Sequence, residues 1–300
     1  MKCDKTVLLA AVLAMASPLW IHAQQPPAQP APGAAPIGAP GRGGAGRGGA
    51  RRTQVLIITG QSYLHDWIGT TPLLKKALDD TGHFEVRVTD EFRGAGPETL
   101  APYDVVVLNY SDGYGTNPEL GWGDRANNAL LDFVRSGKGL VAYHFSLSAF
   151  YNWPEYEKLT GCNWRANQGH HAARHDWMVD VRDAEHPIMK GLRPSFPQYN
   201  DELYANLKCQ PDTTHVLATA YDDHSLYTSR PGDPQTPVGP GKDEPILWTV
   251  NYGNGRVFAT TMGHDASTLT SPGFIATFTR GTEWAAKGKV TILPPTEMLK

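Results

Sequence analysis

Cysteine is scarce in this sequence, with three among 300 residues. Cys3 lies in the N-terminal leader, which leaves Cys162 and Cys209 for the rest of the chain. Neither belongs to a Cys-x-x-Cys pair, which argues against a zinc site built from cysteines. The two could form one disulfide in an oxidising compartment, but their spacing alone does not decide whether they pair.

The sequence also lacks a hydrophobic run long enough to span a membrane, which needs about 20 apolar residues. The run VLLAAVLAMA (7–16) follows Lys2 and Lys5, and IHA precedes Gln24. A basic start, a short apolar run and a small residue at the end are typical of a secretory signal peptide. We therefore expect residues 1–23 to be cleaved and the product to be exported to the periplasm or the exterior without a transmembrane segment. An uncleaved anchor is the alternative.

Acidic and aromatic residues are absent from residues 24–52, where Ile37 is the one large aliphatic side chain. This Pro/Ala/Gly/Arg-rich segment cannot bury a core and predicts a disordered linker before one folded domain, residues 53–300. Since residues 1–23 carry a net charge of +1 and residues 24–52 carry +4, the total of −3 leaves −8 for the domain. An acidic domain argues against a nucleic-acid partner and fits a small substrate or a metal.

Within the domain, apolar runs with strand character alternate at first with helical patterns. Strands are predicted at 54–60, 84–90, 103–110 and 139–144, and helices at 71–82 and 125–139. This β-α-β order predicts a parallel sheet with right-handed crossovers. The second half is richer in strands, predicted at 175–183, 214–222, 245–253 and 255–263, before a closing helix at 274–286. The sequence therefore predicts an α/β domain with a β-rich C-terminal part.

Several motifs follow one another in a recognisable order. They are VLIITGQSYLHDW (55–67), GKGLVAYHFSLSAFYNWPEYEKLTGC (137–162), VDVRDAEHPIMKGL (179–192), DELYANL (201–207), GNGRVFATTMGHDASTL (253–269) and RGTEWAA (280–286). Together they resemble the ThuA-like family, which is named for trehalose utilisation. The resemblance implies a class I glutamine-amidotransferase-like fold: a flavodoxin-like, doubly wound, mostly parallel sheet with helices on both faces. It also implies a role in carbohydrate metabolism, with keto-sugars among the candidate substrates.

His144 stands at the end of the fourth predicted strand. Glutamine amidotransferases of this fold carry a cysteine nucleophile there, and no cysteine lies within residues 143–150 of this chain. We therefore expect no Cys-dependent glutaminase activity. A polar residue that ends a buried strand needs partners, and an imidazole suits proton transfer near neutral pH. We predict that His144 is a catalytic acid/base; a histidine satisfied within the core is the alternative. Ser146 lacks the flanking glycines of a serine-hydrolase elbow.

Other candidates follow from the position of the crevice, which in a doubly wound sheet lies outside the carboxyl ends of the strands. The first strand is followed by His65 and Asp66, and the last strand by His264. Aromatic side chains near these loops could stack on sugar rings. The predicted substrate-binding residues are His65, Asp66, Trp67, Trp153, Tyr204, Arg256 and His264, with Trp164 as a further aromatic. The alternatives are a helix cap for Asp66, a surface ion pair for Arg256 and core packing for the tryptophans.

Two adjacent carboxylates, Asp201 and Glu202, are predicted to orient His144 or to take a second proton. Neighbouring side chains in a strand point to opposite faces, so at most one should face the site. Among the histidines of residues 170–175, the family pattern best matches His171. His186 more simply orders the turn before Pro187.

A metal centre is also compatible with the residue types. His65, His144, His171 and His264 with one carboxylate would suit zinc or another divalent ion, although no HExxH-like spacing is present. The cofactor therefore stays open, as does the oligomeric state. The favoured prediction is an acid/base enzyme acting on small-molecule carbohydrates as an isomerase, lyase or hydrolase. The alternatives are a non-catalytic carbohydrate-binding envelope protein and a metal-dependent sugar hydrolase or isomerase.

Overall fold

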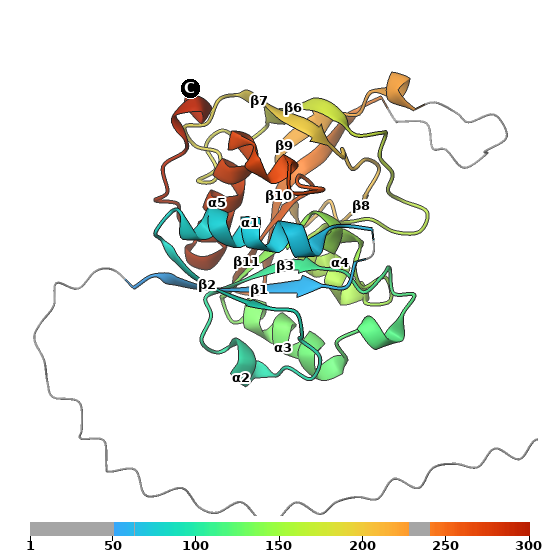
Figure 1. The fold of residues 1–300 in the computed structure, drawn as a ribbon, viewed down its shortest axis with the longest axis vertical. Coiled ribbons are helices and arrows are strands. Elements are labelled where there is room, and N and C mark those ends of the chain that lie inside the picture. Colours follow the sequence, from blue (N-terminus) through green and yellow to red (C-terminus); the bar gives the residue numbers. More distant parts are fainter. Residues whose placement is uncertain (1–50, 63, 228–240) are drawn as a thin grey trace, which may run out of the picture. The chain divides into compact units, whose positions relative to one another are not determined.

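A nine-stranded mixed sheet lies at the centre of the domain (Figure 1). The computed structural model describes residues 51–62, 64–227 and 241–300, all within one unit, Ala50–Lys300. The predicted signal peptide and all but the last two residues of the predicted linker lie outside the described residues. Across the described part, no helix has the length and apolar character needed to cross a membrane.

The strand order of the sheet is β2-β1-β3-β4-β11-β10-β9-β6-β7. The pairs from β2 to β11 are parallel, and the pairs from β11 to β7 are antiparallel. The strands are β1 (Thr53–Gly60), β2 (Phe84–Thr89), β3 (Val105–Tyr110), β4 (Gly139–Tyr143), β6 (His175–Val181), β7 (Ser195–Asp201), β9 (Thr214–Tyr221), β10 (Asp243–Tyr252) and β11 (Gly255–Thr260). A separate ribbon pairs β5 (Cys162–Asn163) with β8 (Lys208–Cys209).

Helices cover both faces of the parallel half. The α-helices are α1 (Trp67–Asp79), α2 (Pro97–Leu100), α3 (Asp124–Arg135), α4 (Pro154–Thr160) and α5 (Pro272–Lys287). Short 3-10 turns are η1 (Pro118–Leu120), η2 (His144–Ser148), η3 (His224–Leu226), η4 (Thr268–Thr270) and η5 (Thr296–Met298). In Figure 1, α1 and α5 lie on one side of β1 and β3, and α2 and α3 lie on the other.

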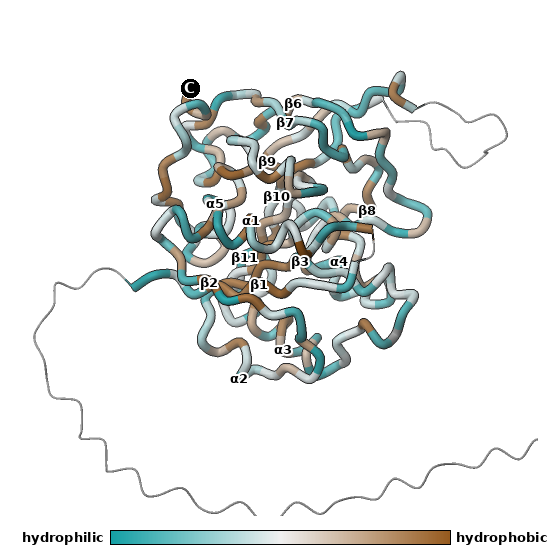
Figure 2. The backbone as a smooth tube through the Cα atoms, in the orientation of Figure 1, coloured by the Kyte–Doolittle hydropathy of each residue, from teal (hydrophilic) through white to brown (hydrophobic). Residues whose placement is uncertain are grey.

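Each face of β1 buries its own set of side chains, because successive residues of a strand point to opposite faces. Val55 and Ile57 pack in the core that includes residues of α1 and α5, while Leu56 and Ile58 pack in the core that includes residues of α3 and α4. Figure 2 shows the most hydrophobic backbone along these central strands. The continuous apolar runs of the sequence are therefore explained by a sheet that is covered on both sides.

The predicted α/β fold and its β-rich C-terminal part are confirmed. Helix α1 begins earlier than predicted, because the Asp66 carboxylate caps it by accepting a hydrogen bond of 2.8 Å from the amide of Gly69. Pro72 consequently lies inside the helix, and the hydroxyl of Thr71 bonds the carbonyl of Trp67 at 2.6 Å. Strand β7 and helix α4 were not predicted.

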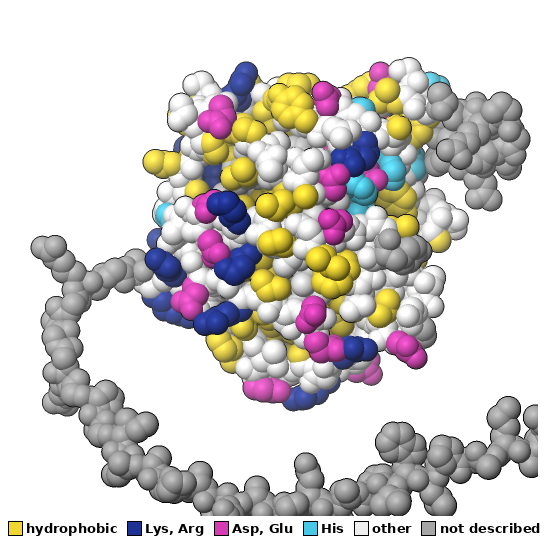
Figure 3. Space-filling model, in the orientation of Figure 1, with side chains coloured by type: hydrophobic (Ala, Val, Ile, Leu, Met, Phe, Trp, Pro, Cys, Tyr) yellow, Lys and Arg dark blue, Asp and Glu magenta, His cyan; other side chains and the backbone are white. Residues whose placement is uncertain are grey.

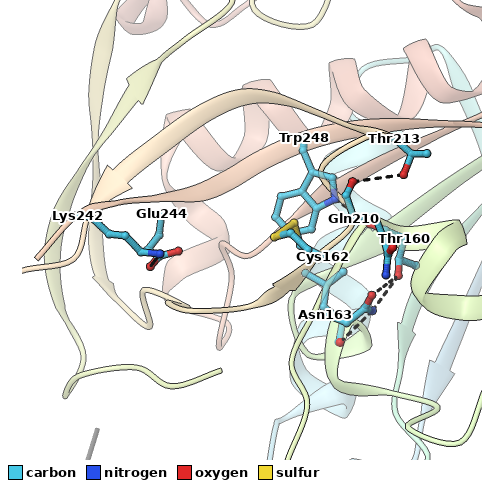
Figure 4. Close-up of a disulfide and its surroundings, with 10 residues drawn as sticks. Thr160, Cys162, Asn163, Gln210, Thr213, Lys242, Glu244 and Trp248 are labelled. Atoms are coloured by element: carbon cyan, nitrogen blue, oxygen red, sulfur yellow. Dashed lines mark hydrogen bonds and ion pairs between the residues drawn. A yellow bond between two sulfur atoms is a disulfide. The ribbon is translucent and has the colours of Figure 1, made fainter. Parts of the chain in front are cut away.

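Cys162 and Cys209 form a disulfide that joins β5 to β8 (Figure 4). Next to it, the indole of Trp248 donates a hydrogen bond of 2.7 Å to the carbonyl of Thr160. The bridge spans 47 residues of sequence, and closing a loop of that length stabilises a fold by about 4 kcal/mol in the chain-entropy view. The enclosed segment contains His171, Glu202 and Tyr204, so the disulfide restrains part of the site described next.

Candidate active site

His144 begins the tight turn η2 directly after β4. Its side chain is fully buried, and its φ of +41° lies in the left-handed region that residues with a Cβ rarely adopt. Such a conformation costs about 1–3 kcal/mol and persists only where the surrounding structure holds it. The turn therefore resembles the strand-to-helix elbow on which other α/β enzymes present a nucleophile, with an imidazole in that place.

A backbone carbonyl fixes the tautomer of His144. Its Nδ1 lies 2.5 Å from the carbonyl oxygen of Thr261. Because a carbonyl only accepts hydrogen bonds, we assign a hydrogen to Nδ1, which leaves Nε2 as the nitrogen that can exchange a proton. Nε2 lies 3.1 Å from the hydroxyl of Tyr204 and 3.5 Å from the carboxylate of Glu202. The basic nitrogen therefore faces other polar groups at the end of the sheet.

Four side chains from separate segments converge there and form what we call the His–Glu cluster: His65, His144, Glu202 and His264. They follow β1, β4, β7 and β11, respectively. Oε2 of Glu202 lies 3.0 Å from Nδ1 of His264, 3.5 Å from Nε2 of His144 and 3.9 Å from Nε2 of His65. Its other oxygen lies 3.5 Å from Nε2 of His171. Glu202 is therefore the common partner of the histidines.

Burial and mutual contacts set the charges of this cluster. Burial lowers the pKa of His65 to about 4, so this imidazole is neutral at neutral pH. Burial would lower the pKa of His264 as well, but the neighbouring Glu202 carboxylate outweighs it and raises that pKa. For Glu202, burial would raise the pKa, but His144, His264 and His65 together hold it well below its usual range. Glu202 is thus a buried anion.

Asp201 fixes the backbone segments that carry Glu202 and His264 of the His–Glu cluster. Its buried carboxylate accepts hydrogen bonds from the amides of Gly263 at 2.7 Å, His264 at 3.0 Å and Glu202 at 2.9 Å. The end of β7 is thereby tied to the turn that follows β11. Because these oxygens are taken up by backbone amides, the structure replaces the predicted catalytic role of Asp201 with a positioning role, and Glu202 is the carboxylate that faces the histidines.

Close packing also restricts this turn at Gly263. Its φ is +110°, and an added Cβ would lie 2.6 Å from the ring of Tyr143. The Tyr143 hydroxyl also donates a hydrogen bond to the Gly263 carbonyl. Only glycine fits this position without displacing the backbone that carries His264.

A cavity of about 310 Å³ opens beside the cluster. Its lining residues are Leu64, His65, Tyr114, Ser148, Trp164, His171, Glu202, Tyr204 and His264. We call it the reaction pocket. Histidine side chains gather at one place on the surface shown in Figure 3. The sequence pointed to six of these lining residues. It missed Leu64 and Tyr114, which lie in loops, and Ser148, the last residue of η2, because no pattern distinguishes them.

Four predicted substrate-binding residues do not line the reaction pocket. Asp66 caps α1, and Trp67 packs partly buried against the core beside it. The guanidinium of Arg256 donates to the carbonyls of Trp284, Ala285 and Ala286, at the C-terminus of α5 and at the opposite end of β11 from His264. These three have structural roles in place of the predicted binding roles. Trp153 lies in a neighbouring cavity.

The His–Glu cluster could hold a divalent ion. One ligand atom from each of its four residues lies within 4.8 Å of the others. A tetrahedral zinc ion with bonds of about 2.0–2.2 Å would place its ligand atoms about 3.3 Å apart. The distances from Glu202 to His264 and His144, 3.0 and 3.5 Å, are close to this, and the distance to His65, 3.9 Å, is longer. Among the described residues, Nδ1 of His264 is buried without a hydrogen bond, since its approach to Glu202 is poorly directed. His171, a predicted ligand, lies outside this group of four.

Fold and site together define a doubly wound, flavodoxin-like α/β protein with a histidine at its elbow and a histidine-rich pocket at the carboxyl edge of the sheet. The chain belongs to the ThuA family, described as trehalose utilisation, whose family model matches residues 54–285.

Solved structures agree with this assignment. A putative ThuA-like protein from Parabacteroides merdae is 29% identical, with a TM-score of 0.69, over 83% of this chain and 95% of that one. A putative ThuA-like protein from Bacteroides uniformis is 22% identical, with a TM-score of 0.60, over 82% of this chain and 97% of that one. A cytoplasmic protein from Salmonella typhimurium is 15% identical, with a TM-score of 0.52, over 78% of this chain and 98% of that one. The last two show the fold alone. No curated protein matches the chain.

Replacing Asp201 by asparagine should destabilise the protein, because the amides of Gly263 and His264 lose a buried anionic acceptor. We expect the free energy of unfolding to fall by about 2–3 kcal/mol, measured by urea unfolding. The control Asp212→Asn, in an exposed turn, should change it by less than about 0.5 kcal/mol. Equal effects of the two variants would contradict the positioning role of Asp201.

Proposed function

We propose that the protein is an exported carbohydrate-active enzyme that moves protons on a sugar bearing a carbonyl group. Membership of the ThuA family supports a carbohydrate substrate, and the groups around the reaction pocket support proton transfer. The observation that carries the proposal is the position of Nε2 of the buried His144, which is oriented by the contact of Nδ1 with Thr261 and lies directly behind Glu202 and Tyr204 of the reaction pocket. An aromatic face with nearby hydrogen-bonding groups suits a sugar ring.

His144 is the acid/base residue in this proposal. Its Nε2 takes the proton from the carbon next to the carbonyl, and the electrons of the broken carbon–hydrogen bond form an enolate. The anionic Glu202, 3.5 Å away, stabilises the resulting imidazolium. Return of the proton to the former carbonyl carbon, with transfer of the α-hydroxyl proton to the former carbonyl oxygen, completes an isomerisation. Loss of a leaving group from the carbon beyond the enolate, with its oxygen taking the proton from His144, completes an elimination.

Tyr204 is suited to bind the oxygen on which charge develops. Its hydroxyl lies 3.1 Å from Nε2 of His144 and 3.3 Å from Nε2 of His65. Burial raises the pKa of Tyr204 well above its ordinary value, so the hydroxyl keeps its proton. Once Nε2 of His144 has taken the substrate proton and no longer accepts this hydrogen bond, the hydroxyl can donate it to the enolate oxygen in the reaction pocket.

Cysteine chemistry has no part in the proposal. Cys162 and Cys209 are joined to each other, and Cys3 lies outside the described residues. Cys-dependent glutaminase activity is accordingly not expected.

Export is supported by the leader sequence and by the disulfide, since disulfides persist mainly in oxidising compartments. Protein isolated from its source cells without reductant should begin at Gln24 and contain the Cys162–Cys209 bond. N-terminal sequencing and mass spectrometry of peptides check both. A cytosolic product that still begins at Met1 and carries free thiols would contradict export.

Replacing His144 by alanine should abolish turnover of keto-hexoses, with a loss of at least about 100-fold, because positioned acid/base groups contribute 10²–10⁴-fold. The thermal midpoint should fall as well, because His144 is fully buried beside the Glu202 anion, so circular dichroism first checks that the variant is folded. The control His215→Ala removes an exposed histidine outside the reaction pocket and should leave turnover intact. Turnover that survives in His144→Ala would refute the assignment, and wild-type binding without turnover of any sugar would indicate a carbohydrate-binding protein.

Metal-assisted sugar chemistry is the second candidate. It is favoured by the four ligand atoms within 4.8 Å and by the unpartnered Nδ1 of His264. A divalent ion there would polarise a substrate oxygen or a water, and His144 would be a ligand in place of a base.

Elemental mass spectrometry of the purified protein separates the two candidates. Metal-assisted chemistry predicts about one equivalent of a transition metal in the wild type, its loss in Glu202→Gln and its retention in the control His171→Ala. Absence of metal from all three proteins would contradict metal-assisted chemistry and leave proton transfer by His144 as the proposed function.

A further inference from the structure

We propose that a second cavity binds a small organic cation, a quaternary ammonium that carries a hydroxyl group. Its volume is about 200 Å³, and its lining includes Asp112, Trp122, Asn127, Phe150, Asn152 and Trp153. We call it the aromatic cavity. Among the described residues, none lines both this cavity and the reaction pocket, so the inference is independent of the proposed function.

Three aromatic rings form walls of the aromatic cavity, and each stands steeply against the next. The ring centroids of Trp122 and Phe150 lie 4.7 Å apart with an angle of 64° between the ring planes. Those of Phe150 and Trp153 lie 5.4 Å apart with an angle of 85°. Rings that meet in this way bound a corner in which a cation can contact more than one π system, as in the aromatic cages that bind quaternary ammonium groups.

Asp112 places a negative charge in the same cavity. Its side chain is buried, and Oδ1 accepts hydrogen bonds from the amides of Phe150 at 2.8 Å and Gly115 at 3.2 Å. Among the described residues, no hydrogen bond reaches Oδ2 and no basic side chain forms an ion pair with this carboxylate. The guanidinium of Arg165 contributes to its electrostatic surroundings but is paired with Glu157 at 2.7 Å. The Asp112 anion therefore lacks a counter-ion of its own.

Burial raises the pKa of the Asp112 carboxyl, against the opposing effect of the amides of Phe150 and Gly115. The ionised carboxylate is thus incompletely compensated, and a buried anion in that condition is unfavourable. None of the described residues that line the cavity is a lysine, an arginine or a histidine. A ligand that brings a positive charge would supply the missing compensation.

The remaining groups favour a quaternary ammonium over other ions. A phosphate or a carboxylate would be repelled by Asp112. A calcium ion takes six to eight oxygen ligands, which aromatic walls do not provide. A primary ammonium has three N–H donors that would each need an acceptor, whereas a quaternary ammonium has none.

Asn127 accounts for the hydroxyl group of the proposed ligand. Among the described residues, its Oδ1 is a buried acceptor without a hydrogen bond. Buried polar atoms are normally satisfied, so this acceptor indicates a ligand with one hydrogen-bond donor. A short chain that joins a trimethylammonium group to a hydroxyl has both features, and choline is the simplest probe of this class.

Isothermal titration of the purified protein with choline and with 3,3-dimethylbutan-1-ol tests the inference. The second compound has the shape of choline with carbon in place of the charged nitrogen. Choline should bind at least about ten-fold more tightly, because the aromatic walls and Asp112 both attract the positive charge. Failure of choline to bind, or equal affinity for the two compounds, would overturn the inference.

Two variants locate the binding in the aromatic cavity. Asp112→Asn keeps an acceptor for the amides of Phe150 and Gly115 but removes the charge, so the affinity for choline should fall about ten-fold and that for the neutral compound should not change. The control Asp212→Asn makes the same change of charge in an exposed turn and should leave both affinities as they are.

Trp153→Ala protects the test against misfolding of Asp112→Asn, because Trp153 is only half-buried. Removal of this wall should also weaken choline binding about ten-fold, and circular dichroism checks that each variant is folded. The control Tyr199→Ala, which removes an exposed aromatic ring on β7, should bind choline like the wild type. Choline affinity that is unchanged in folded Trp153→Ala would place the binding elsewhere and overturn the inference.

Discussion

The buried carboxylate of Glu202 is the interaction on which the site depends. An isolated buried anion is strongly unfavourable, so it requires compensating groups on several sides. Here His144 and His264 supply them at 3.5 and 3.0 Å, and His65 lies 3.9 Å away. Because these histidines come from different strand ends, satisfying one charge fixes the relative positions of four segments. The same arrangement brings Nε2 of His144, the Glu202 carboxylate and the imidazole of His264 together beside the pocket.

The sheet makes this convergence possible. Strands β1, β4 and β11 are parallel, so the loops that carry His65, His144 and His264 leave the same edge of the sheet. Glu202 follows β7 in the antiparallel half of the sheet, and Asp201 links it to the turn after β11 through backbone amides. The β-rich C-terminal addition is therefore part of the site: it supplies the anion, and it carries Tyr204 within the segment closed by the disulfide.

Apolar periodicity and glycine placement were sufficient to predict the α/β order, since buried strands and amphipathic helices leave strong local patterns. The position of His144 at the end of β4, where it joins the His–Glu cluster, could likewise be predicted from the single histidine after an apolar run. Asp66 and Arg256 could not be interpreted correctly, because a cap and a pocket residue look alike in sequence and only the backbone positions of Gly69 and of the end of α5 distinguish them. Which of Asp201 and Glu202 faces the pocket depends on the register of β7, a strand interrupted by Pro197 that the pattern does not reveal.

Hydrogen exchange at a sugar carbon tests the central claim, that the His–Glu cluster moves a substrate proton. Keto-hexoses with the carbonyl at carbon 2, 3 or 4 would be incubated with the protein in D₂O and followed by NMR. The account predicts that deuterium enters the carbon next to the carbonyl of at least one of them, and that this exchange is lost in His144→Ala and Glu202→Gln. Exchange that is absent from the wild type, or unchanged in both variants, would contradict it.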